Sequence, residues 1–525
     1  MTTTIDGSAS ALEPLFAFLS YALIQAESAV YKIPGSHVIA RYVKSSHQND
    51  PGRTVLEILL ALFAIRTLLQ SRTRADNGEK HFIQFSEKEV DELVDEWTPE
   101  PLGAPLTPEE QSDLASVPVV SGANGPRPKL ANTGKQVLNL ASYNFTGLAG
   151  NETINVRAIE TLRKYGVGSC DVHMDLERDI ADFLGTEASI LYSQGFSTIP
   201  CVISAFAKRG DIIVADRGVN FAIQKGLQIS RSTVRWFDHN DLKSLEDVLL
   251  SVEKERRKRR GTSSQDDSLS PRVSLRKDGA MVDLPELIEL KHKYKYRLIL
   301  DESISFGTVG RTGRGLTELY NVPATQIDMI VGSVANGLNS SGGFCAGSRI
   351  VVDHQRINGT SFVFSAAVPA LLAVSASEGI NILRNTPSIL STLQENVRAI
   401  RAVLDRVEAI TIPSHAASPI IHIHLRSSAP AASVSAKPSN PATPAPREAP
   451  SFDIVGEERL LQDIVDEALA QGVWTTRARR LRGQELVDAR PSIRLAVTAA
   501  LSRKECERAA GVIKAAVVKV LAKRK

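Results

Sequence analysis

The segment from Leu298 to Ser303 constrains the fold more than any other part of the chain. It reads Leu-Ile-Leu-Asp-Glu-Ser, an apolar run that ends in two carboxylates. Such a run is typical of a strand buried on both faces. Glycines at positions 307, 310, 313 and 315 follow and predict a turn-rich loop. The segment predicts an α/β fold with a cofactor cleft at the strand end, although a glycine loop that binds no ligand fits the same residues.

A second informative segment, residues 332–347, is rich in glycine and contains no lysine. Together the two segments resemble the α-oxoamine synthases, fold-type-I enzymes that use pyridoxal phosphate (PLP). The resemblance places Asp301 at the position of the cofactor-binding aspartate, which pairs with the pyridine nitrogen. It places Asn336 at the position of the lysine that forms the Schiff base. An amide cannot form an imine, because its nitrogen lone pair is delocalised into the carbonyl.

Other polar groups of the family are also replaced. Phe221 stands where active relatives have a histidine that stacks on the PLP ring, and a phenyl ring can stack but cannot exchange a proton. Ile304 stands where they have another histidine. Three such replacements in one cleft predict a chain that has no catalytic residue of its own, in which Asp301 is vestigial.

The resemblance extends over roughly residues 50–520 and is closest to one branch of the family, the serine palmitoyltransferases, in which a lysine-less subunit pairs with a lysine-bearing one. Five further segments carry this likeness: Phe344–Gly347, Asp353–Arg356, Phe364–Ala366, Phe221–Gln228 and Pro491–Arg494. It implies a required, non-catalytic subunit of an enzyme that condenses L-serine with palmitoyl-CoA to 3-ketodihydrosphingosine, with PLP bound covalently by the partner. Cys170 and Arg494 are the candidates for a site shared across the subunit interface.

The fold implied by the resemblance is α/β, a fold-type-I PLP-transferase architecture with a mostly parallel central sheet. We expect an N-terminal region at 1–75, an acidic helix and connector at 76–135, a large domain at 136–369 and a small C-terminal domain at 370–525. The last contains an Ala/Pro/Ser-rich insertion at 427–450, whose composition predicts a disordered loop.

An apolar segment near the N-terminus, at about residues 54–70, predicts a helix that is short for a bilayer span of about 20 residues. Its charges, Glu57 and Arg66, lie near its ends, where side chains can reach the headgroups. A buried helix of a soluble domain is the alternative. The resemblance implies a single-pass helix in the endoplasmic reticulum membrane, and Arg72 and Arg74 favour a cytosolic catalytic body.

Composition excludes several function classes. With 62 basic and 59 acidic residues the chain is nearly balanced, so no nucleic-acid partner is implied. Its 4 cysteines are widely spaced, which indicates free thiols rather than a disulfide framework. His422 and His424 alternate on one face of a predicted strand, but without a third ligand nearby we predict no metal site.

Two places depart from the family pattern. A stretch that relatives carry between the equivalents of Cys170 and Asp171 is absent, and residues 272–277 are a poor version of an apolar strand that precedes Asp278. The sequence leaves open whether these gaps are natural.

Two other functions fit the sequence. The chain could be an independent PLP enzyme that uses a displaced lysine such as Lys225, or a membrane scaffold that regulates the complex without touching its chemistry.

Overall fold

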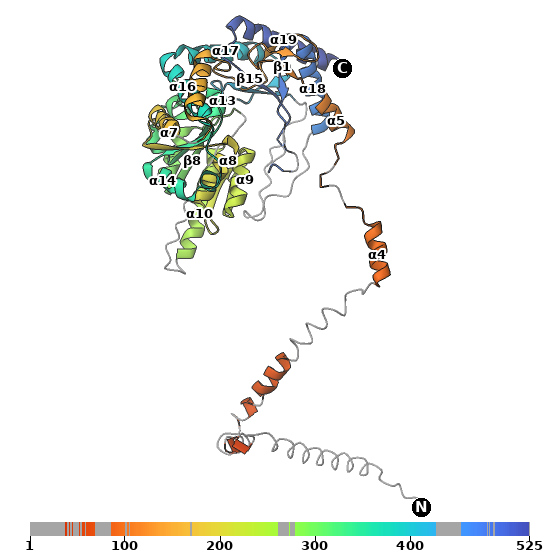
Figure 1. Cartoon of the computed structure of the whole chain (residues 1–525), viewed down its shortest axis with the longest axis vertical. Coiled ribbons are helices and arrows are strands. Elements are labelled where there is room, and N and C mark those ends of the chain that lie inside the picture. The colour runs from red at the N-terminus through yellow and green to blue at the C-terminus, as the bar shows by residue number, and fades with distance from the viewer. Residues whose placement is uncertain are drawn as a thin grey trace, which may run out of the picture. The chain divides into compact units, whose positions relative to one another are not determined.

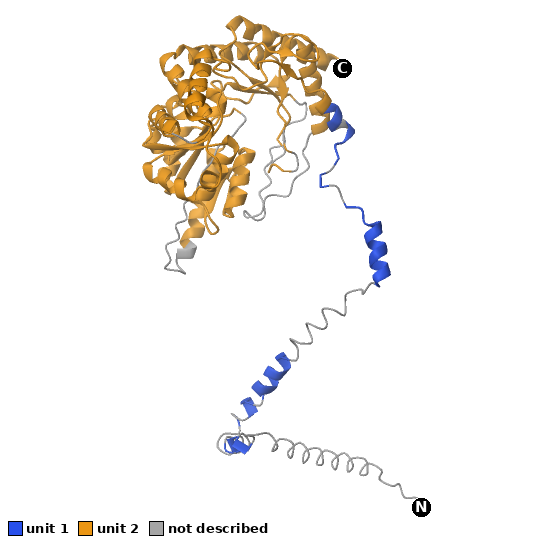
Figure 2. Cartoon of the chain, in the orientation of Figure 1, with its two compact units in different colours: residues 1–113 blue, residues 114–525 orange. Residues whose placement is uncertain are grey.

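The computed structural model describes most of the chain from residue 86 onward. The described residues are 37–38, 41–42, 45, 52, 55–57, 59–68, 86–99, 102–103, 105–168, 171–260, 272–273, 279–426, 453–479, 481, 484–486 and 489–523. They fall into two compact units, residues 1–113 and residues 114–525 (Figure 2).

The first unit contains short helices. Its α4, Glu87–Glu96, begins with a capping box in which the hydroxyl of Ser86 and the carboxylate of Glu89 each bond the other residue's backbone N–H. This confirms the predicted acidic helix. Residues 59–68 are helical and expose their apolar side chains. Among the residues that the structure describes, no helix is both long enough and apolar enough to cross a bilayer.

The second unit is built on a five-stranded sheet (Figure 1). In spatial order its strands are β4 (Ala188–Tyr192), β10 (Gly343–Gly347), β9 (Met329–Ser333), β8 (Arg297–Asp301) and β7 (Arg272–Val273). Strands β7, β8 and β9 are parallel, whereas β10 is antiparallel to both of its neighbours. Because β10 alone runs against the other four strands, the sheet is mixed but mostly parallel, as expected. A parallel pair, β5 (Ile212–Asp216) and β6 (Thr233–Phe237), lies beside β7.

The sheet is buried on both faces because the central positions of its strands are mostly apolar. Leu298 and Leu300 of β8 point into one hydrophobic cluster, and Ile299 between them points into the other. The helices of this part of the unit are α6 (Glu152–Tyr165), α7 (Asp171–Leu184), α8 (Gly195–Phe206), α9 (Phe221–Ser230), α10 (Leu242–Arg260), α11 (Leu284–Tyr294), α12 (Leu316–Leu319), α13 (Val334–Leu338), α14 (Arg349–Asn358), α15 (Thr360–Val363) and α16 (Ala370–Asn385), with a 3-10 turn at Ala324–Gln326.

A smaller antiparallel sheet lies in the C-terminal part of the same unit. Its strand order is β11 (Ile410–Thr411), β12 (Ile420–Leu425), β15 (Ile493–Ala496) and β14 (Thr476–Arg477). The accompanying helices are α17 (Ser388–Leu404), α18 (Ile454–Ala470) and α19 (Arg503–Ala522). This is the expected smaller α/β part of the fold.

The start of the second unit pairs with this C-terminal part. Strand β3 (Leu138–Asn139) pairs in parallel with β13 (Val473–Trp474), and a short hairpin of β1 (Val120–Ser121) and β2 (Lys129–Leu130) precedes it. Residues near 138 therefore contribute to the smaller part of the fold.

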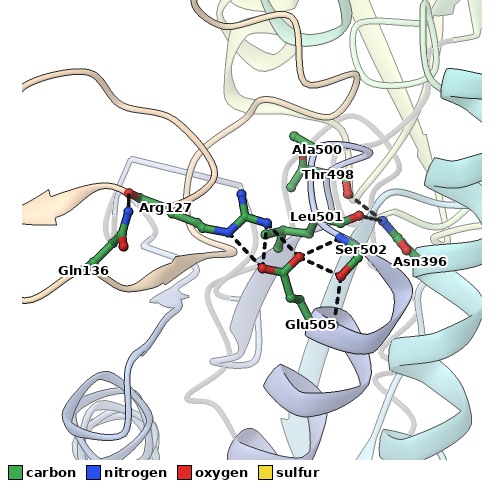
Figure 3. Close-up of polar contacts among 8 residues, drawn as sticks. All are labelled: Arg127, Gln136, Asn396, Thr498, Ala500, Leu501, Ser502 and Glu505. Carbon is green, nitrogen blue, oxygen red and sulfur yellow. Dashed lines mark hydrogen bonds and ion pairs between the residues drawn. The ribbon is translucent and has the colours of Figure 1, made fainter.

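An ion pair fixes this early segment to the last helix. The guanidinium of Arg127 donates from Nε and Nη2 to the two carboxylate oxygens of Glu505, each at 2.8 Å. Glu505 also completes a capping box with Ser502 at the start of α19. Asn396 of α17 donates to the carbonyls of Thr498 and Leu501 just before that helix (Figure 3). We call Arg127, Asn396, Ser502 and Glu505 the α19 anchor.

Candidate active site

A cavity of about 390 Å³ lies where β4, β5, β8 and β9 end. This is the edge of a doubly wound sheet at which such folds bind their ligands. Its lining combines hydroxyl groups, small residues and apolar side chains: Tyr143, Gly195, Phe196, Ile199, Asn220, Ala222, Gly279, Ala280, Met281, Val282, Asp301, Ser303, Ile304, Ser305, Val309, Leu316, Ser333, Ala335, Asn336, Ser341, Gly342 and Ser418. The two segments that the sequence marks as most informative, residues 298–303 and 332–347, both contribute residues to this lining.

The two carboxylates at the end of β8 have different surroundings. Asp301 lines the cavity, and its Oδ1 accepts hydrogen bonds from the backbone N–H and the hydroxyl of Ser303. Glu302 points into the protein and is 1% exposed, with its carboxylate accepting from the backbone N–H of Leu316 and from the hydroxyl of Ser305. Burial, reinforced by the charge of Asp301, raises the pKa of Glu302 to about 7. Glu302 therefore holds the glycine loop, whereas Asp301 faces the cavity.

Asn336 lies on α13, directly after β9, and also lines the cavity. Its Nδ2 donates to the backbone carbonyl of Ser303 at 2.8 Å. This bond links α13 to the end of β8. Gly337 allows the approach, because a Cβ there would lie 2.4 Å from the carbonyl oxygen of Phe306. The amide thus serves as a link in the wall of the cavity.

Phe221 begins α9 and is half-buried. Its ring centroid lies 6.2 Å from that of Phe196, which lines the cavity. The Nζ of Lys225, the candidate displaced lysine, lies 4.9 Å from the Phe221 ring and 3.3 Å from Gln228 Oε1. Asn220 and Ala222 line the cavity, while Phe221 and Lys225 are not among its lining residues.

The turn at residues 193–194, between β4 and α8, lies beside the cavity. The hydroxyls of Ser197 and Thr198 both donate back to the carbonyl of Gln194. Ser333, across from Gly195, donates to the carbonyl of Gly342 and accepts from the N–H of Ala335. These three hydroxyl protons are therefore used within the chain.

Arg494 lies behind the cavity wall and not on it. Its Nη1 donates to the hydroxyl of Tyr143 at 3.1 Å, its Nη2 donates to the carbonyl of Ala141, and its guanidinium stacks over the Tyr143 ring. Tyr143 does line the cavity, so Arg494 acts on it through this phenol. Tyr143 is not among the site residues expected from the sequence, because only the fold brings it next to Arg494.

The other residues singled out in the sequence lie elsewhere. His173 is buried, and its Nε2 bonds the carbonyl of Val368 at 2.6 Å, a contact that stabilises the fold outside the cavity lining. His422 Nδ1 contacts Ser492 Oγ and His424 Nδ1 contacts the carbonyl of Pro491. In the described residues, no three His, Cys, Asp or Glu side chains form a metal site. Cys170 and Asp278, which flank the two expected gaps, lie outside the described residues.

The described lining does not fit covalently held PLP. It contains no lysine, and the amide at the lysine position is engaged with the carbonyl of Ser303. It contains no arginine or histidine for the phosphate, and the nearby hydroxyl protons are spent on backbone carbonyls. What the site retains is the aspartate and the shape of the cavity.

Comparison with known proteins identifies the family to which this fold belongs. The model of the family described as aminotransferase class I and II matches residues 135–262 and 277–513, so the interruption falls at the poor strand around β7. The chain is 33% identical over 555 residues to serine palmitoyltransferase 1 of Saccharomyces cerevisiae, and the match covers 96% of each chain. It is 41% identical over 390 residues to long chain base biosynthesis protein 1c of Oryza sativa subsp. japonica, covering 73% of this chain and 77% of that one.

Solved structures agree on the fold. The serine palmitoyltransferase of Sphingomonas wittichii superposes with a TM-score of 0.64 at 20% identity, covering 79% of this chain and 96% of that one. The 8-amino-7-oxononanoate synthase of Francisella tularensis gives 0.56 at 16% identity, covering 73% and 98%. At these identities the likeness shows the fold alone.

Proposed function

We propose that this chain is the subunit of its complex that forms no Schiff base with PLP, and that the partner subunit forms that bond. The premise is that the chain belongs to the aminotransferase class I and II family and to its serine palmitoyltransferase 1 branch. The chain is a subunit of serine palmitoyltransferase, a PLP-dependent transferase of sphingolipid long-chain base synthesis. The reaction we assign to the complex condenses L-serine with palmitoyl-CoA to 3-ketodihydrosphingosine, with release of CO₂ and CoA.

One observation carries the non-catalytic role. At the lysine position stands Asn336, whose side chain is a hydrogen-bond link to Ser303. PLP, when bound to the partner's lysine, supplies the electron sink for the carbanion chemistry. This chain then contributes the wall around that site. Arg494 and Cys170 remain our candidates for the shared part, and Arg494 would act by orienting the Tyr143 hydroxyl.

Exposed apolar side chains support a partner at the rim of the cavity. Phe196 lines the cavity and is 57% exposed, and Phe364, just after α15, is 84% exposed. The two lie near one another, because Ser365 contacts Ser193 in the turn before α8 at 3.5 Å. Large apolar side chains left in water at one rim mark a protein interface. We assign this rim to the lysine-bearing subunit.

The deciding experiment locates the cofactor. The complex is purified with both subunits, reduced with borohydride in the presence of PLP, and digested for mass spectrometry. We expect the pyridoxyl adduct on a lysine of the partner and none on this chain. An adduct on Lys225 of the isolated chain, with turnover, would instead establish the displaced-lysine enzyme.

A variant separates the shared-site role from a pure scaffold. Arg494→Met keeps the length of the side chain but removes the donor to Tyr143. We expect the complex to assemble normally and its kcat/KM for L-serine to fall about tenfold or more, as for a lost charged hydrogen bond. Arg426→Met, an exposed arginine after β12, is the control. Unchanged kinetics for Arg494→Met and for substitutions of Cys170 would favour the scaffold.

For location, we propose that residues 54–70 anchor the chain in the endoplasmic reticulum membrane as a single pass, with the catalytic body in the cytosol. The support is the apolar surface of the described helix, where Leu59, Leu60, Phe63 and Leu68 are all more than half exposed. Alkaline extraction of full-length chain and of a chain lacking residues 1–75 tests this. The proposal fails if both are released equally into the soluble fraction.

A further inference from the structure

Three asparagines of the described chain stand directly before a glycine: Asn124, Asn336 and Asn358. Such a pair is open to a reaction within the chain, because glycine has no side chain to shield its backbone nitrogen. That nitrogen attacks the Cγ atom of the asparagine, and a five-membered succinimide ring forms. The new N–Cγ bond replaces the Cγ–Nδ2 bond, and ammonia leaves with the proton of the glycine N–H. Water then opens the ring to aspartate or isoaspartate.

The pair at Asn336 is held in a helix and fixed on both sides. Ring closure would turn the asparagine ψ angle out of the helical range, and Asn336 lies in α13. Its Nδ2, the leaving nitrogen, donates to the carbonyl of Ser303 at 2.8 Å. The carbonyl of Gly337 accepts from the hydroxyl of Thr146 at 2.7 Å in the protein interior. The reaction at Asn336 therefore requires local unfolding.

The pair at Asn358 is held by the last turn of α14. Its Nδ2 donates to the carbonyl of His354 at 3.0 Å. The N–H of Gly359, which carries the attacking nitrogen, donates to the carbonyl of Gln355 at 2.7 Å. Gly359 is also buried, and even a Cβ there would lie 2.6 Å from the carbonyl oxygen of Gln355. The reaction at Asn358 therefore requires this turn to open.

The pair at Asn124 is held less firmly. Asn124 is exposed and lies in the loop between β1 and β2, outside any helix or strand. The N–H of Gly125 donates to the carbonyl of Ala123 at 3.0 Å, a contact within the loop that opens without breaking a helix or a strand pair. A Cβ added at Gly125 would meet nothing within 4 Å, so the attacking nitrogen lies in an uncrowded part of the chain. The fold thus protects Asn336 and Asn358 and leaves Asn124 open to the reaction.

The side chain of Asn124 joins the β1–β2 hairpin to the segment that leads to the cavity. Its Oδ1 accepts from Asn139 Nδ2 at 3.1 Å, and its Nδ2 donates to Ser142 Oγ at 3.2 Å. Asn139 Oδ1 in turn accepts from the N–H groups of Ala141 and Ser142. The next residue, Tyr143, lines the cavity. Loss of the amide removes the donor to Ser142, and isoaspartate also lengthens the backbone of the loop by one methylene.

We propose that Asn124 is a site of spontaneous covalent modification, at which the side-chain amide is converted to aspartate and isoaspartate. The isoaspartate loosens the contact between the β1–β2 hairpin and Asn139. It also makes the chain a substrate for the class of methyltransferase that methylates isoaspartyl carboxylates. The inference is independent of the proposed function, because the reaction needs neither PLP nor the partner subunit.

Peptide mass spectrometry of the purified full-length chain tests the proposal. The folded chain is kept at neutral pH, sampled over time and digested, and each Asn–Gly peptide is scored for conversion. We expect Asn124 to convert about tenfold faster or more than Asn336 and Asn358, because each of those must first break hydrogen bonds. In the denatured chain the three rates should become similar. Methylation by an isoaspartyl methyltransferase with a labelled methyl donor identifies the isoaspartate.

Gly125→Ala is the matched variant. Its new Cβ meets nothing within 4 Å and the φ angle of Gly125 is not positive, so the loop should keep its conformation. The added methyl group shields the attacking nitrogen. Conversion at Asn124 should therefore slow by about tenfold, while conversion at Asn336 and Asn358 should stay as in the parent chain. Thermal unfolding verifies the fold of the variant.

Hydrogen exchange measures the effect on the hairpin. The N–H groups of Ala141 and Ser142 should exchange faster in chain that carries isoaspartate at position 124. Asn124→Asp, which has the new charge without the extra methylene, should show a smaller change. Conversion at Asn124 no faster than at the two helical pairs, or conversion that is not slowed in Gly125→Ala, would overturn the modification site. Unchanged exchange at residues 141 and 142 would overturn the loosening of the hairpin.

Discussion

Two regions of the molecule, the cavity end of β8 and the start of α19, each depend on a glutamate, and the pKa of that glutamate shifts in opposite directions. Glu302 ends the cavity strand β8 and Glu505 lies in the first turn of α19. Both accept from a backbone N–H and a serine hydroxyl. Burial raises the pKa of Glu302 to about 7, whereas hydrogen bonds from Ser502 and the ion pair with Arg127 lower the pKa of Glu505 to about 2.

The difference lies in what surrounds each carboxyl group. The α19 anchor holds a charge with an opposite charge, as a surface-facing structural site does. At the cavity end of β8, the carboxyl group of Glu302 accepts hydrogen bonds from Ser305 and Leu316, and the nearby amide of Asn336 bonds the carbonyl of Ser303. This end of the cavity wall therefore uses its hydrogen bonds within the chain, as a structural framework does.

The largest effect is expected from one substitution, glycine to alanine, made both in the cavity wall and in α19. At Gly337 an added Cβ would meet the carbonyl oxygen of Phe306 at 2.4 Å, whereas at Gly511 of α19 it would meet nothing within 4 Å. Gly337→Ala should lower the free energy of unfolding by about 3 kcal/mol. Gly511→Ala should raise it by up to about 1 kcal/mol. Chemical denaturation measures both, and equal effects would show that the cavity wall is not tightly built.

The next effect is the pH dependence of Glu302→Gln. The folded state keeps the proton of Glu302 up to about pH 7, while the unfolded chain releases it near 4.5. The stability contributed by the protonated acid is therefore complete below 4.5 and is lost as pH rises toward 7. Relative to the parent chain, the free energy of unfolding of Glu302→Gln should rise by on the order of 3 kcal/mol between pH 4.5 and about pH 7. A difference that stays constant with pH would refute a raised pKa.

Glu505→Gln should show the opposite sign and a smaller size. Its carboxylate contributes stability above the usual pKa of 4.5, and that contribution is lost as pH falls toward 2. At neutral pH we expect a loss of about 1 kcal/mol, because the ion pair is partly exposed and solvent screens it. Glu507→Gln, whose partner Arg503 is far more exposed, is the control and should change little. Equal losses would mean that the anchor adds nothing beyond a surface pair.

The smallest effect is expected at Lys225. Its ammonium lies over the Phe221 ring, away from the described cavity lining. Lys225→Ala should leave the turnover of the complex within about twofold and its stability within about 0.5 kcal/mol. If Lys225→Ala instead abolished the borohydride trapping of PLP, the ammonium of Lys225 would have to reach the cavity. The contrast between the cavity and the α19 anchor would then no longer hold.

Much of the site could be predicted from local sequence. The apolar run before Asp301 requires a buried strand, and the missing amine at residue 336 needs no coordinates to be recognised. Which of the two carboxylates faces the cavity could not be predicted, because both follow the strand directly. The two carboxylates differ in burial. The burial of Glu302 depends on the glycine loop, which brings the backbone N–H of Leu316 to its carboxylate.

Long-range relations escaped prediction for a similar reason. Strand β10 is apolar and reads the same whether it runs parallel or antiparallel to β4. The bond between Arg127 and Glu505 joins residues 378 positions apart, and neither has a local pattern that names its partner. Tyr143 likewise becomes a site residue only when β15 brings Arg494 behind it.

The pairing of β3 with β13 has a consequence for how the chain is made. Residues 138–139 leave the ribosome long before residues 473–474, yet each strand completes the other. Strand β3 therefore stays without its β13 partner while more than half of the protein is synthesised. Premature termination anywhere in that interval leaves an exposed strand edge, a ready target for chaperones and quality control.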